Sequence, residues 1–292
     1  MKDHIIIGTR GSALALWQTQ WVTAALQKLY PKLVITQTVI KTTGDKILDS
    51  PLSKIGDKGL FTKELEKAML DGKIDLAVHS LKDVPTVIPD GLMLGAIAER
   101  DDVRDVFVSH PKKKYSNLDA VPSGGTIATG SLRRKCQLLA YRPDLNIADI
   151  RGNLQTRKEK LDASDWDGML LAKAGVTRLG WDSLIAQIID TTIMLPAVGQ
   201  GALAIEIRKN DQAVAEMIEP LNHHETCLAT LSERSLLRHL EGGCQIPIGA
   251  YARVVNGNLI LDAVVGALDG KTIIRNSISG NTSDAEALGI QL

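Results

Sequence analysis

The sequence predicts an α/β protein, and two features of the chain lead to this fold class. Short apolar runs typical of buried strands alternate with stretches in which apolar residues recur at helical spacing. The order β-α-β-α-β between Ile5 and Val78 predicts a mainly parallel sheet with helices on both faces. A chain of 292 residues is too long for one comfortable core, so we expect two or three domains.

The first predicted unit contains four strands and two helices. The strands are expected at Ile5–Ile7, Val34–Ile40, Ile74–Val78 and Leu94–Ala98. The first helix carries Leu14, Trp17, Trp21, Ala25 and Leu29 at helical spacing, and the second carries Leu60, Phe61, Leu65, Ala68 and Met69 on one face. Residues 42–51, which include Gly44 and Asp45, are expected to form a polar loop. The charged run Glu99–Asp102 marks a possible crossing to a second unit.

The second unit repeats the alternation of strands and helices. Its strands are expected at Val106–Ser109, Thr126–Ala128, Ile147–Ile150 and Met169–Ala172, and its helices at Leu132–Ala140 and Leu154–Leu161. The flexible segment Pro196–Gly201 could be a return crossing, and it leads into a strand at Leu203–Ile207.

The last part of the chain reads as a small separate α/β domain. Asn222 is a good N-cap, and Glu225 three residues later completes a capping box that opens a helix. Strands are expected at Ile248–Val255, Leu259–Gly266 and Thr272–Ser277. We expect no metal at the adjacent His223 and His224, because their spacing matches no zinc motif.

The composition excludes several classes of protein. Aromatic residues make up only 3% of the chain and the formal net charge is zero, which argues against a protein that binds nucleic acid by stacking and a basic field. No apolar run approaches the ~18 residues of a membrane span, and the N-terminus lacks the features of a signal peptide. Three cysteines without a CxxC pair are typical of a reducing compartment, so we expect a cytoplasmic protein.

A titratable cluster follows the predicted strand Ile74–Val78. His79, Ser80, Lys82 and Asp83 come within five residues, and Val84 before a proline is biased towards extended backbone. Ligands in open α/β sheets bind beyond the carboxyl ends of the strands, so this cluster is a candidate site. An ordinary polar surface loop explains this stretch about equally well.

Cationic residues recur at the junctions between predicted strands and helices. Ser131 looks like an N-cap, which places Arg133 and Arg134 in the first turn of a helix, where cations oppose the helix dipole and suggest a compensating anion. Similar junctions contain Arg10, Lys54, Lys58, Arg151 and Arg157. Each could instead pair with a nearby surface carboxylate.

The ligand predicted by these cations is a small polycarboxylate. The arginine fork suits carboxylate or phosphate, and the chain has neither nucleotide-binding glycine motif. A buried, ionised Asp83 among the cations could serve as a general acid or base or stabilise a developing cation.

Cys244 differs from the other two cysteines. Cys136 and Cys227 fall at apolar helix positions and are expected to pack in the core, whereas Cys244 follows two glycines in a predicted loop. An accessible thiol of this kind is a candidate for covalent attachment, although an incidental loop cysteine explains the spacing equally well.

A series of motifs, in order along nearly the whole chain, resembles the porphobilinogen deaminase (hydroxymethylbilane synthase) family. They are Gly-Thr-Arg-Gly-Ser at 8–12, Gly-Asp at 44–45, Lys-Gly-Leu-Phe at 58–61, Val-His-Ser-Leu-Lys-Asp-Val-Pro at 78–85, Ser-Leu-Arg-Arg at 131–134, Arg-Gly-Asn with Thr-Arg at 151–157, Ala-Val-Gly-Gln-Gly-Ala at 197–202 and Leu-Glu-Gly-Gly-Cys-Gln-Ile-Pro at 240–247.

The resemblance implies three domains. The first, residues 1–99 with 200–217, and the second, residues 100–199, are expected to resemble the lobes of a type II periplasmic binding protein. The third, residues 218–292, is expected to be a small α/β domain with an antiparallel sheet that carries Cys244.

The resemblance also implies a monomeric, cytoplasmic transferase with a dipyrromethane cofactor held by a thioether to Cys244. Such an enzyme adds four porphobilinogen molecules in sequence, each losing ammonia, and releases 1-hydroxymethylbilane by hydrolysis. The strongest alternative is a two-lobed anion-binding module without catalysis. A phosphate-transfer enzyme would need a P-loop, which the chain lacks.

The residues that match the family motifs receive roles by this resemblance. Asp83 is expected to be catalytic. The cofactor would be bound by Cys244, Asp45, Lys82, Asp83, Thr129, Ser131, Arg133, Arg134, Gly152 and Arg157. The substrate would be bound by Arg10, Ser12, Lys54, Lys58, Phe61, Ser80, Arg151 and Gln200, the last at a hinge position.

Two departures from the family pattern stand out. Gly130 replaces the first of two serines that usually precede Leu-Arg-Arg, so one hydroxyl is missing. The chain ends at Leu292, where family members typically continue, and the third domain is expected to lack that further helix.

Overall fold

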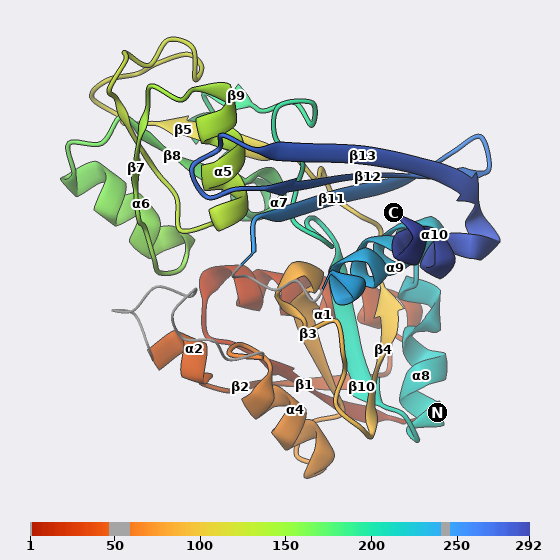
Figure 1. The fold of residues 1–292 in the computed structure, drawn as a ribbon. Coiled ribbons are helices and arrows are strands. Elements are labelled where there is room, and N and C mark those ends of the chain that lie inside the picture. The colour runs from red at the N-terminus through yellow and green to blue at the C-terminus, as the bar shows by residue number, and fades with distance from the viewer. Residues whose placement is uncertain (1, 47–58, 241–245) are drawn as a thin grey trace. The chain divides into compact units, whose positions relative to one another are not determined.

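The computed structural model describes residues 2–46, 59–240 and 246–292 (Figure 1). The chain forms two compact units. The first contains described residues 2–46, 59–101 and 201–228, and the second contains residues 102–200, 229–240 and 246–292. Each unit is described here on its own.

The first unit is built on a five-stranded sheet of order β2-β1-β3-β10-β4. β1 pairs in parallel with both β2 and β3, whereas β10 runs antiparallel between β3 and β4. The sheet is therefore mixed, and the segment after Gly201 does return to the first unit. The strands are β1 (His4–Thr9), β2 (Val34–Val39), β3 (Leu76–Ser80), β4 (Leu92–Ile97) and β10 (Leu203–Arg208).

Helices cover both faces of this sheet, as the alternating apolar runs predict. Ile5, Ile7, Leu76 and Val78 pack on one face with α1 and α8, while Ala77 packs on the other with α4. The helices are α1 (Ala13–Leu29), α2 (Thr43–Lys46), α4 (Lys63–Leu70) and α8 (Gln212–Ile218), with 3₁₀ turns η1 (Leu81–Asp83) and η3 (Glu219–Leu221).

Helix α1 forms where expected, but its apolar stripe is not its buried face. Trp17, Trp21 and Leu29 are 36%, 38% and 45% exposed. The face that packs on the sheet carries Ala15, Gln18, Thr19, Val22, Thr23 and Leu26. Half of these residues are polar, so apolar periodicity points to the wrong side of the helix.

Two further local expectations are corrected. The segment 42–51 is not entirely loop, because α2 occupies Thr43–Lys46. Leu60 and Phe61 precede α4 instead of lying on its face, since that helix begins at Lys63.

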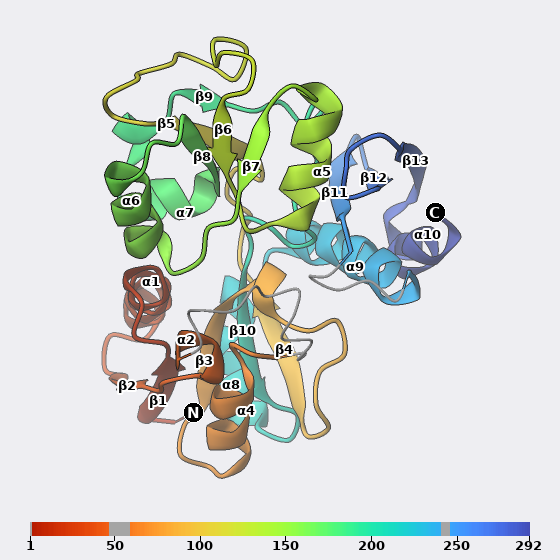
Figure 2. The ribbon, with the colours of Figure 1, turned by 60° about the vertical axis from the view of Figure 1, so that its left-hand side comes forward.

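The second unit contains a five-stranded sheet with the same pattern, β7-β6-β8-β5-β9. β6 is parallel to β7 and β8, and β5 runs antiparallel between β8 and β9. Figure 2 shows α5 on one face and α6 and α7 on the other, each over its own apolar cluster. The elements are β5 (Asp105–Ser109), β6 (Thr126–Ala128), α5 (Leu132–Tyr141), β7 (Asn146–Ala148), α6 (Leu154–Ala163), β8 (Gly168–Ala172), α7 (Lys173–Arg178), η2 (Asp182–Leu184) and β9 (Gln187–Ile188).

A three-stranded antiparallel sheet of order β11-β12-β13 follows the long helix α9. The buried Glu233 on α9 fastens this sheet to the rest of the second unit, because its two oxygens accept hydrogen bonds from Gly199 N (2.7 Å) and Ala252 N (2.8 Å). The elements are α9 (His224–His239), β11 (Ile248–Val255), β12 (Asn258–Gly266), β13 (Ile273–Asn281), η4 (Thr282–Asp284) and α10 (Ala285–Gln291).

The capping box expected at Asn222 is wrong. The Asn222 side chain accepts a hydrogen bond from Ile97 N at 2.9 Å, and the His223 ring accepts from Thr226 N at 3.2 Å at the start of α9. The Asn222 side chain, which the local sequence assigns to the helix cap, is instead bonded to a residue 125 positions away.

The predicted α/β class is confirmed: two mixed sheets with helices on both faces are followed by an antiparallel three-stranded sheet. The limits of three domains remain a prediction, since the residues after Ala229 cluster with 102–200 in one unit. Among the described residues, no helix combines the length and apolar character that a membrane span requires.

Candidate functional site

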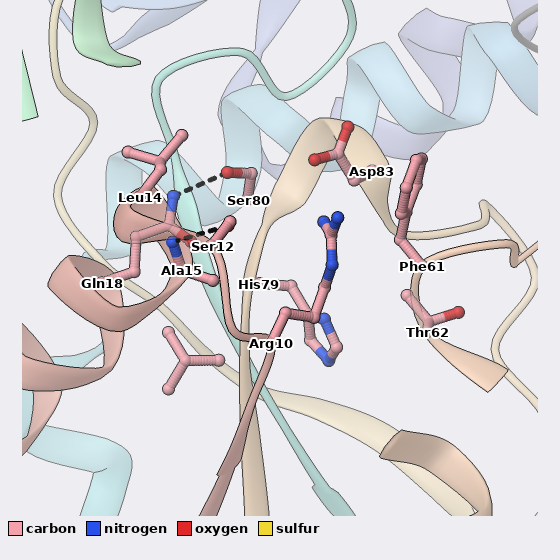
Figure 3. Close-up of a pocket in the computed structure, with 11 residues that line it drawn as sticks. Arg10, Ser12, Leu14, Ala15, Gln18, Phe61, Thr62, His79, Ser80 and Asp83 are labelled. Carbon is pink, nitrogen blue, oxygen red and sulfur yellow. Dashed lines mark hydrogen bonds between the residues drawn. The ribbon is translucent and has the colours of Figure 1, made fainter. Parts of the chain in front are cut away.

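A pocket lies at the carboxyl end of β3, within the first unit (Figure 3). Its walls come from the β1–α1 junction, from the residues before α4 and from β3 with η1. It is lined by Arg10, Ser12, Leu14, Ala15, Gln18, Phe61, Thr62, Val78, His79, Ser80 and Asp83. The strand-end cluster and the first cationic junction therefore meet in one place.

Asp83 is held at the pocket by apolar residues on either side of it. Leu81 is 1% exposed, and its N–H donates to Ala202 O at 3.0 Å, while Val84 N donates to Leu81 O at 3.1 Å. Asp83 itself is exposed, so the expectation of a buried carboxylate is wrong. The buried residues Leu81 and Val84 hold the backbone on either side of Asp83, which leaves its side chain exposed. Figure 3 shows the Arg10 guanidinium extending towards Asp83.

Arg10 is fixed by two partners. Its Nη2 and Nε donate to the two oxygens of Asp45, the latter at 3.3 Å, and its Cζ lies 4.2 Å from the centre of the Phe61 ring. Burial alone would raise the pKa of Asp45, but hydrogen bonds from Arg10 and Thr42 outweigh it and hold that pKa below its ordinary value. Asp45 thus orients Arg10 as a charged pair.

Gln18 is a pocket residue that the sequence analysis missed. Its amide nitrogen donates to Ser80 Oγ at 2.7 Å, and its side chain is 3% exposed. Ser12 caps α1 by accepting from Ala15 N at 3.3 Å. A polar residue six positions after an N-cap serine could have signalled this position, but the apolar stripe drew attention to the opposite face.

His79 is bonded behind the pocket to a second residue that the sequence analysis missed. Its Nε2 lies 3.1 Å from Glu206 Oε2, and the side chains are 4% and 0% exposed. Glu206 lies on β10, 127 residues away, so no local pattern announces the pair.

Asp105 organises the predicted cationic site of the second unit. Its Oδ2 accepts from Arg133 Nη1 at 2.7 Å, and its Oδ1 accepts from Arg134 Nη2 at 2.8 Å and from Gln200 Nε2 at 2.8 Å. Burial alone would raise the pKa of Asp105, but the two guanidinium groups hold it well below its usual range. These arginines do pair with a carboxylate, but it is one fully buried acid that serves both and not a surface carboxylate.

One positive charge remains in this cluster, because two arginines face a single carboxylate. Their side chains are 5% and 6% exposed. Among the described residues, neither Arg133 Nε nor Arg134 Nε has a hydrogen-bond partner. A buried surplus charge with unpaired N–H groups suits an anion, since buried donors without partners are costly.

The start of α5 has the predicted cap. Ser131 Oγ accepts from Arg134 N at 3.4 Å, and Thr129 Oγ1 accepts from Ser131 N at 3.2 Å. Gly130 is packed closely: a Cβ there would lie 2.5 Å from Ile150 O. The missing hydroxyl at 130 thus coincides with a close approach of two backbone segments.

The junction before α6 holds the remaining cations of the second unit. Arg157 Nε donates to Gly152 O at 2.9 Å, and Gly152 has a φ of 114°, a conformation that favours glycine. Within the described chain, Arg151 Nη1 is buried without a hydrogen-bond partner.

Gln200 and Lys82 differ from the pocket residues. Gln200 is 1% exposed, and its amide also donates to Val103 O at 2.7 Å, so it ties the two crossing segments together. Lys82 lies in η1 but does not line the pocket. Lys54, Lys58 and Cys244 lie outside the described residues.

The described residues contain no group of acidic, histidine and cysteine side chains that could hold a metal ion. Cys136 is buried, and Cys227 is partly buried against the cluster that includes Leu81. Burial raises the pKa of both thiols.

Comparison with known protein families accounts for nearly the whole chain. Residues 5–216 match the family described as porphobilinogen deaminase, dipyromethane cofactor binding domain, and residues 227–292 match porphobilinogen deaminase, C-terminal domain. Curated porphobilinogen deaminases of Chlorobium phaeobacteroides (strain BS1) and Desulforamulus reducens are 55% and 52% identical over 296 and 292 aligned residues. Both alignments cover 100% of this chain and 94% of the relative.

Solved structures of other proteins align less closely. The Bordetella pertussis BvgS periplasmic VFT2 domain is 12% identical, with a TM-score of 0.43 over 74% of this chain and 85% of that chain. The BenM effector binding domain with benzoate is 14% identical, with a TM-score of 0.44 over 74% and 90%. At this level of likeness, neither alignment bears on function.

The two family matches and the full-length relatives agree on one activity. It is porphobilinogen deamination in tetrapyrrole biosynthesis, with a dipyrromethane cofactor. The chain belongs to the porphobilinogen deaminase (hydroxymethylbilane synthase) family.

Proposed function

We propose that this chain joins four porphobilinogen molecules head to tail on a dipyrromethane primer bound covalently to Cys244, and then releases 1-hydroxymethylbilane by hydrolysis. The observation that supports this most strongly is the pocket at the end of β3, where Asp83 and Arg10 lie beside hydroxyl and amide groups. A ring that carries carboxylates and an N–H group, and that develops positive charge, needs this combination of groups.

The cluster around Asp105 fits an anionic cofactor. Each pyrrole of dipyrromethane carries an acetate and a propionate, and the buried pair Arg133 and Arg134 keeps one surplus charge and two unpaired Nε–H groups. We assign cofactor carboxylates to these arginines and to Arg157, with Thr129, Ser131, Gly152, Lys82 and Asp45 as further contacts. The bound cofactor supplies a free pyrrole carbon to which the first substrate is joined.

The residues of the first unit are assigned to the substrate. Arg10, held by Asp45, provides charge for a carboxylate, and Ser80, held by Gln18, provides a hydroxyl. Phe61 offers an aromatic face beside Arg10. Ser12, Lys54, Lys58, Arg151 and Gln200 complete the proposed set of substrate residues.

Asp83 is assigned the chemical role. When the carbon–nitrogen bond of the substrate's protonated aminomethyl group breaks, ammonia leaves with the electron pair and the positive charge passes to the pyrrole ring. A carboxylate that accepts the ring N–H stabilises this charge as it develops. The buried neighbours Leu81 and Val84 keep the carboxylate in place during the step.

We further assign the enzyme to the cytoplasm as a monomer. The three cysteines without a CxxC pair and the buried Cys136 support a reducing compartment. Sedimentation of the purified protein tests the monomer, and a dimer at micromolar concentration would contradict it.

The mass of the denatured protein tests covalent attachment. The wild-type chain is expected to weigh more than its sequence by one dipyrromethane, and Cys244→Ser is expected to remove the excess. Cys136→Ser and Cys227→Ser are the matched controls, and both should keep the extra mass. A wild-type chain without added mass, even after incubation with porphobilinogen, would instead favour a two-lobed anion-binding module.

Substitution of Asp83 tests the catalytic role. Asp83→Asn is expected to retain the cofactor mass and to lose about a hundredfold or more of its turnover. The control is Asp90→Asn, an exposed acid of the same unit, which should leave turnover unchanged. Turnover by Asp83→Asn within threefold of wild type would remove Asp83 from this role.

A further inference from the structure

The buried pair His79 and Glu206 has no part in the functions assigned above. The two residues lie on neighbouring strands, and the register pairs Ala204 with His79 and Glu206 with Ala77. Residues two apart on a strand share a face, so His79 and Glu206 are diagonal neighbours on one face of the sheet. Their side chains meet through Nε2 and Oε2 at 3.1 Å.

This contact fixes the tautomer of the imidazole. An ionised carboxylate only accepts hydrogen bonds, so Nε2 must carry the hydrogen when Glu206 is ionised. In the neutral ring, Nδ1 then keeps its lone pair. Nδ1, on the other side of the ring, takes no part in this contact.

The same ring lines the catalytic pocket. His79 is one of the pocket residues with Arg10, Ser80 and Asp83, and Figure 3 shows its ring below the Arg10 side chain. The parallel register Ile7 to Leu76 and Gly8 to Ala77, continued by two residues, brings Arg10 alongside His79. The histidine therefore both contacts a buried carboxylate and lines the pocket.

A third ionisable group lies close to the pair and interacts electrostatically with both residues. Glu66 on α4 is 6% exposed, and burial, together with the neighbouring Glu206 carboxylate, raises the pKa of its carboxyl group. A carboxyl that holds its proton to higher pH adds less negative charge beside Glu206.

We propose that His79 is a further substrate-contacting residue of this pocket, and that Glu206 is the positioning residue that aims its Nδ1 lone pair at a pyrrole N–H. The inference rests on the proposed function. Two pyrrole rings meet in every coupling step, and Asp83 is assigned to the N–H of one of them. His79 supplies the acceptor for the other.

The chemistry of the step shows why a second acceptor matters. The carbon–nitrogen bond of the incoming substrate's protonated amine breaks, ammonia leaves with the electron pair, and the methylene carbon bonds to the free carbon of the acceptor ring. That ring then carries the positive charge until it releases the proton from the same carbon to solvent. An acceptor on its N–H stabilises the charge throughout, and the Glu206 carboxylate behind the imidazole strengthens the effect.

Two substitutions at position 79 separate the two ends of the ring. His79→Gln places an amide where Nε2 lies, so it can still donate to Glu206, but it has no acceptor at the Nδ1 position. His79→Asn places its amide near the Nδ1 position and leaves Glu206 without a partner. We expect His79→Gln to keep the wild-type melting temperature within a few degrees and the full cofactor mass, and to lose about tenfold to a hundredfold in kcat.

The variants His79→Asn and Asp75→Asn separate an effect on kcat from an effect on stability. His79→Asn is expected to melt lower than His79→Gln, because a fully buried carboxylate loses its donor. Asp75→Asn, at the other end of β3, is the matched control: it should lower the melting temperature with kcat unchanged. A kcat of His79→Gln within twofold of wild type would overturn the proposal.

A direct measurement covers the case in which the variants fold poorly. Nitrogen NMR of histidine-labelled wild-type holoenzyme is expected to show His79 with a hydrogen on Nε2 and none on Nδ1. Glu206→Gln is expected to change that pattern and to lower kcat more than it changes KM. The opposite tautomer in the wild type would overturn the proposal.

The outcomes distinguish this inference from the function on which it rests. A wild-type protein without dipyrromethane mass would defeat the proposed function itself. A loaded wild type that depends on Asp83 but not on His79 would defeat the inference alone.

Discussion

Replacement of Asp105 by asparagine should be among the most destabilising single changes in the second unit. The carboxylate is 0% exposed and accepts hydrogen bonds from two guanidinium groups and one amide at 2.7–2.8 Å. Asparagine keeps the shape but removes the charge, and its NH₂ group turns a donor towards groups that only donate.

The size of the effect follows from burial. Arg133 and Arg134 are 5% and 6% exposed, so Asp105→Asn leaves two buried cations without a counter-charge. Breaking a buried ion pair by removal of one partner costs about 3–5 kcal/mol. At about 2–4 °C per kcal/mol for a unit of this size, the melting temperature should fall by roughly 6–20 °C.

Asp102 provides a matched control three residues away. It also has two cationic partners, Arg104 at 2.7 Å and Lys173 at 3.6 Å, but it is 24% exposed. An ion pair open to solvent contributes about 0–1 kcal/mol, so Asp102→Asn should shift the melting temperature by only a few degrees. Differential scanning calorimetry of the two variants beside the wild type measures the contrast. Equal melting temperatures for both variants would refute the reasoning from burial.

The pH dependence gives a second check on Asp105. Its folded-state pKa is depressed, so the stability it contributes is present above its unfolded pKa of about 3.9 and is lost as pH falls through the folded pKa. The difference in unfolding free energy between wild type and Asp105→Asn should therefore be constant from about pH 5 to 8 and shrink below about pH 4. A difference that grows on acidification would contradict the assignment.

Three other outcomes follow from described contacts. Gly289→Ala would bring a Cβ to 2.2 Å from a backbone oxygen of α9, so we expect a loss of about 1–3 kcal/mol in unfolding free energy. Urea denaturation measures this loss, and an unchanged midpoint would show that α10 can shift to make room. Because burial raises the thiol pKa of Cys136 and Cys227, neither should react with iodoacetamide in the native protein at pH 7.5. Peptide mass spectrometry detects the reaction, and alkylation of either cysteine would contradict the prediction. Gln18→Ala removes the donor to Ser80 Oγ and should raise KM several-fold with little loss of stability, and steady-state kinetics with an unchanged KM would argue against its role in the pocket.

Features set by neighbouring residues could be predicted from the sequence. The Ser131 cap of α5, the strand that ends at Ser80 and the polar turn around Asp83 all depend on a few adjacent positions. The sequence motifs also predicted the protein family, and the family comparisons confirm that prediction.

Features set by distant partners could not be predicted. Asp105 lies 28 residues from Arg133, and Glu206 lies 127 residues from His79, so only the folded sheet brings each pair together. For the same reason Asn222, a good local cap, bonds instead to Ile97. Burial, which decides the energy of these contacts, is likewise a property of the fold.

The polar buried face of α1 shows a different limit. Trp17 and Trp21 lie on the exposed face of the helix, whereas apolar residues at helical spacing usually mark the face that packs on the core. Gln18 on the opposite face is buried for the hydrogen bond it gives to Ser80. A helix that carries pocket residues need not follow the rule for helices that only fill a core.

The position of β10 between β3 and β4 has a consequence for the order in which the protein is made. Residues 203–208 leave the ribosome only after all of residues 102–200 have been synthesised, yet β4 has no other partner in the described sheet. Until then the nascent first unit exposes the open edges of β3 and β4, which are ready to pair with another chain. Completion of the sheet of the first unit is therefore delayed until the residues between β4 and β10 have emerged.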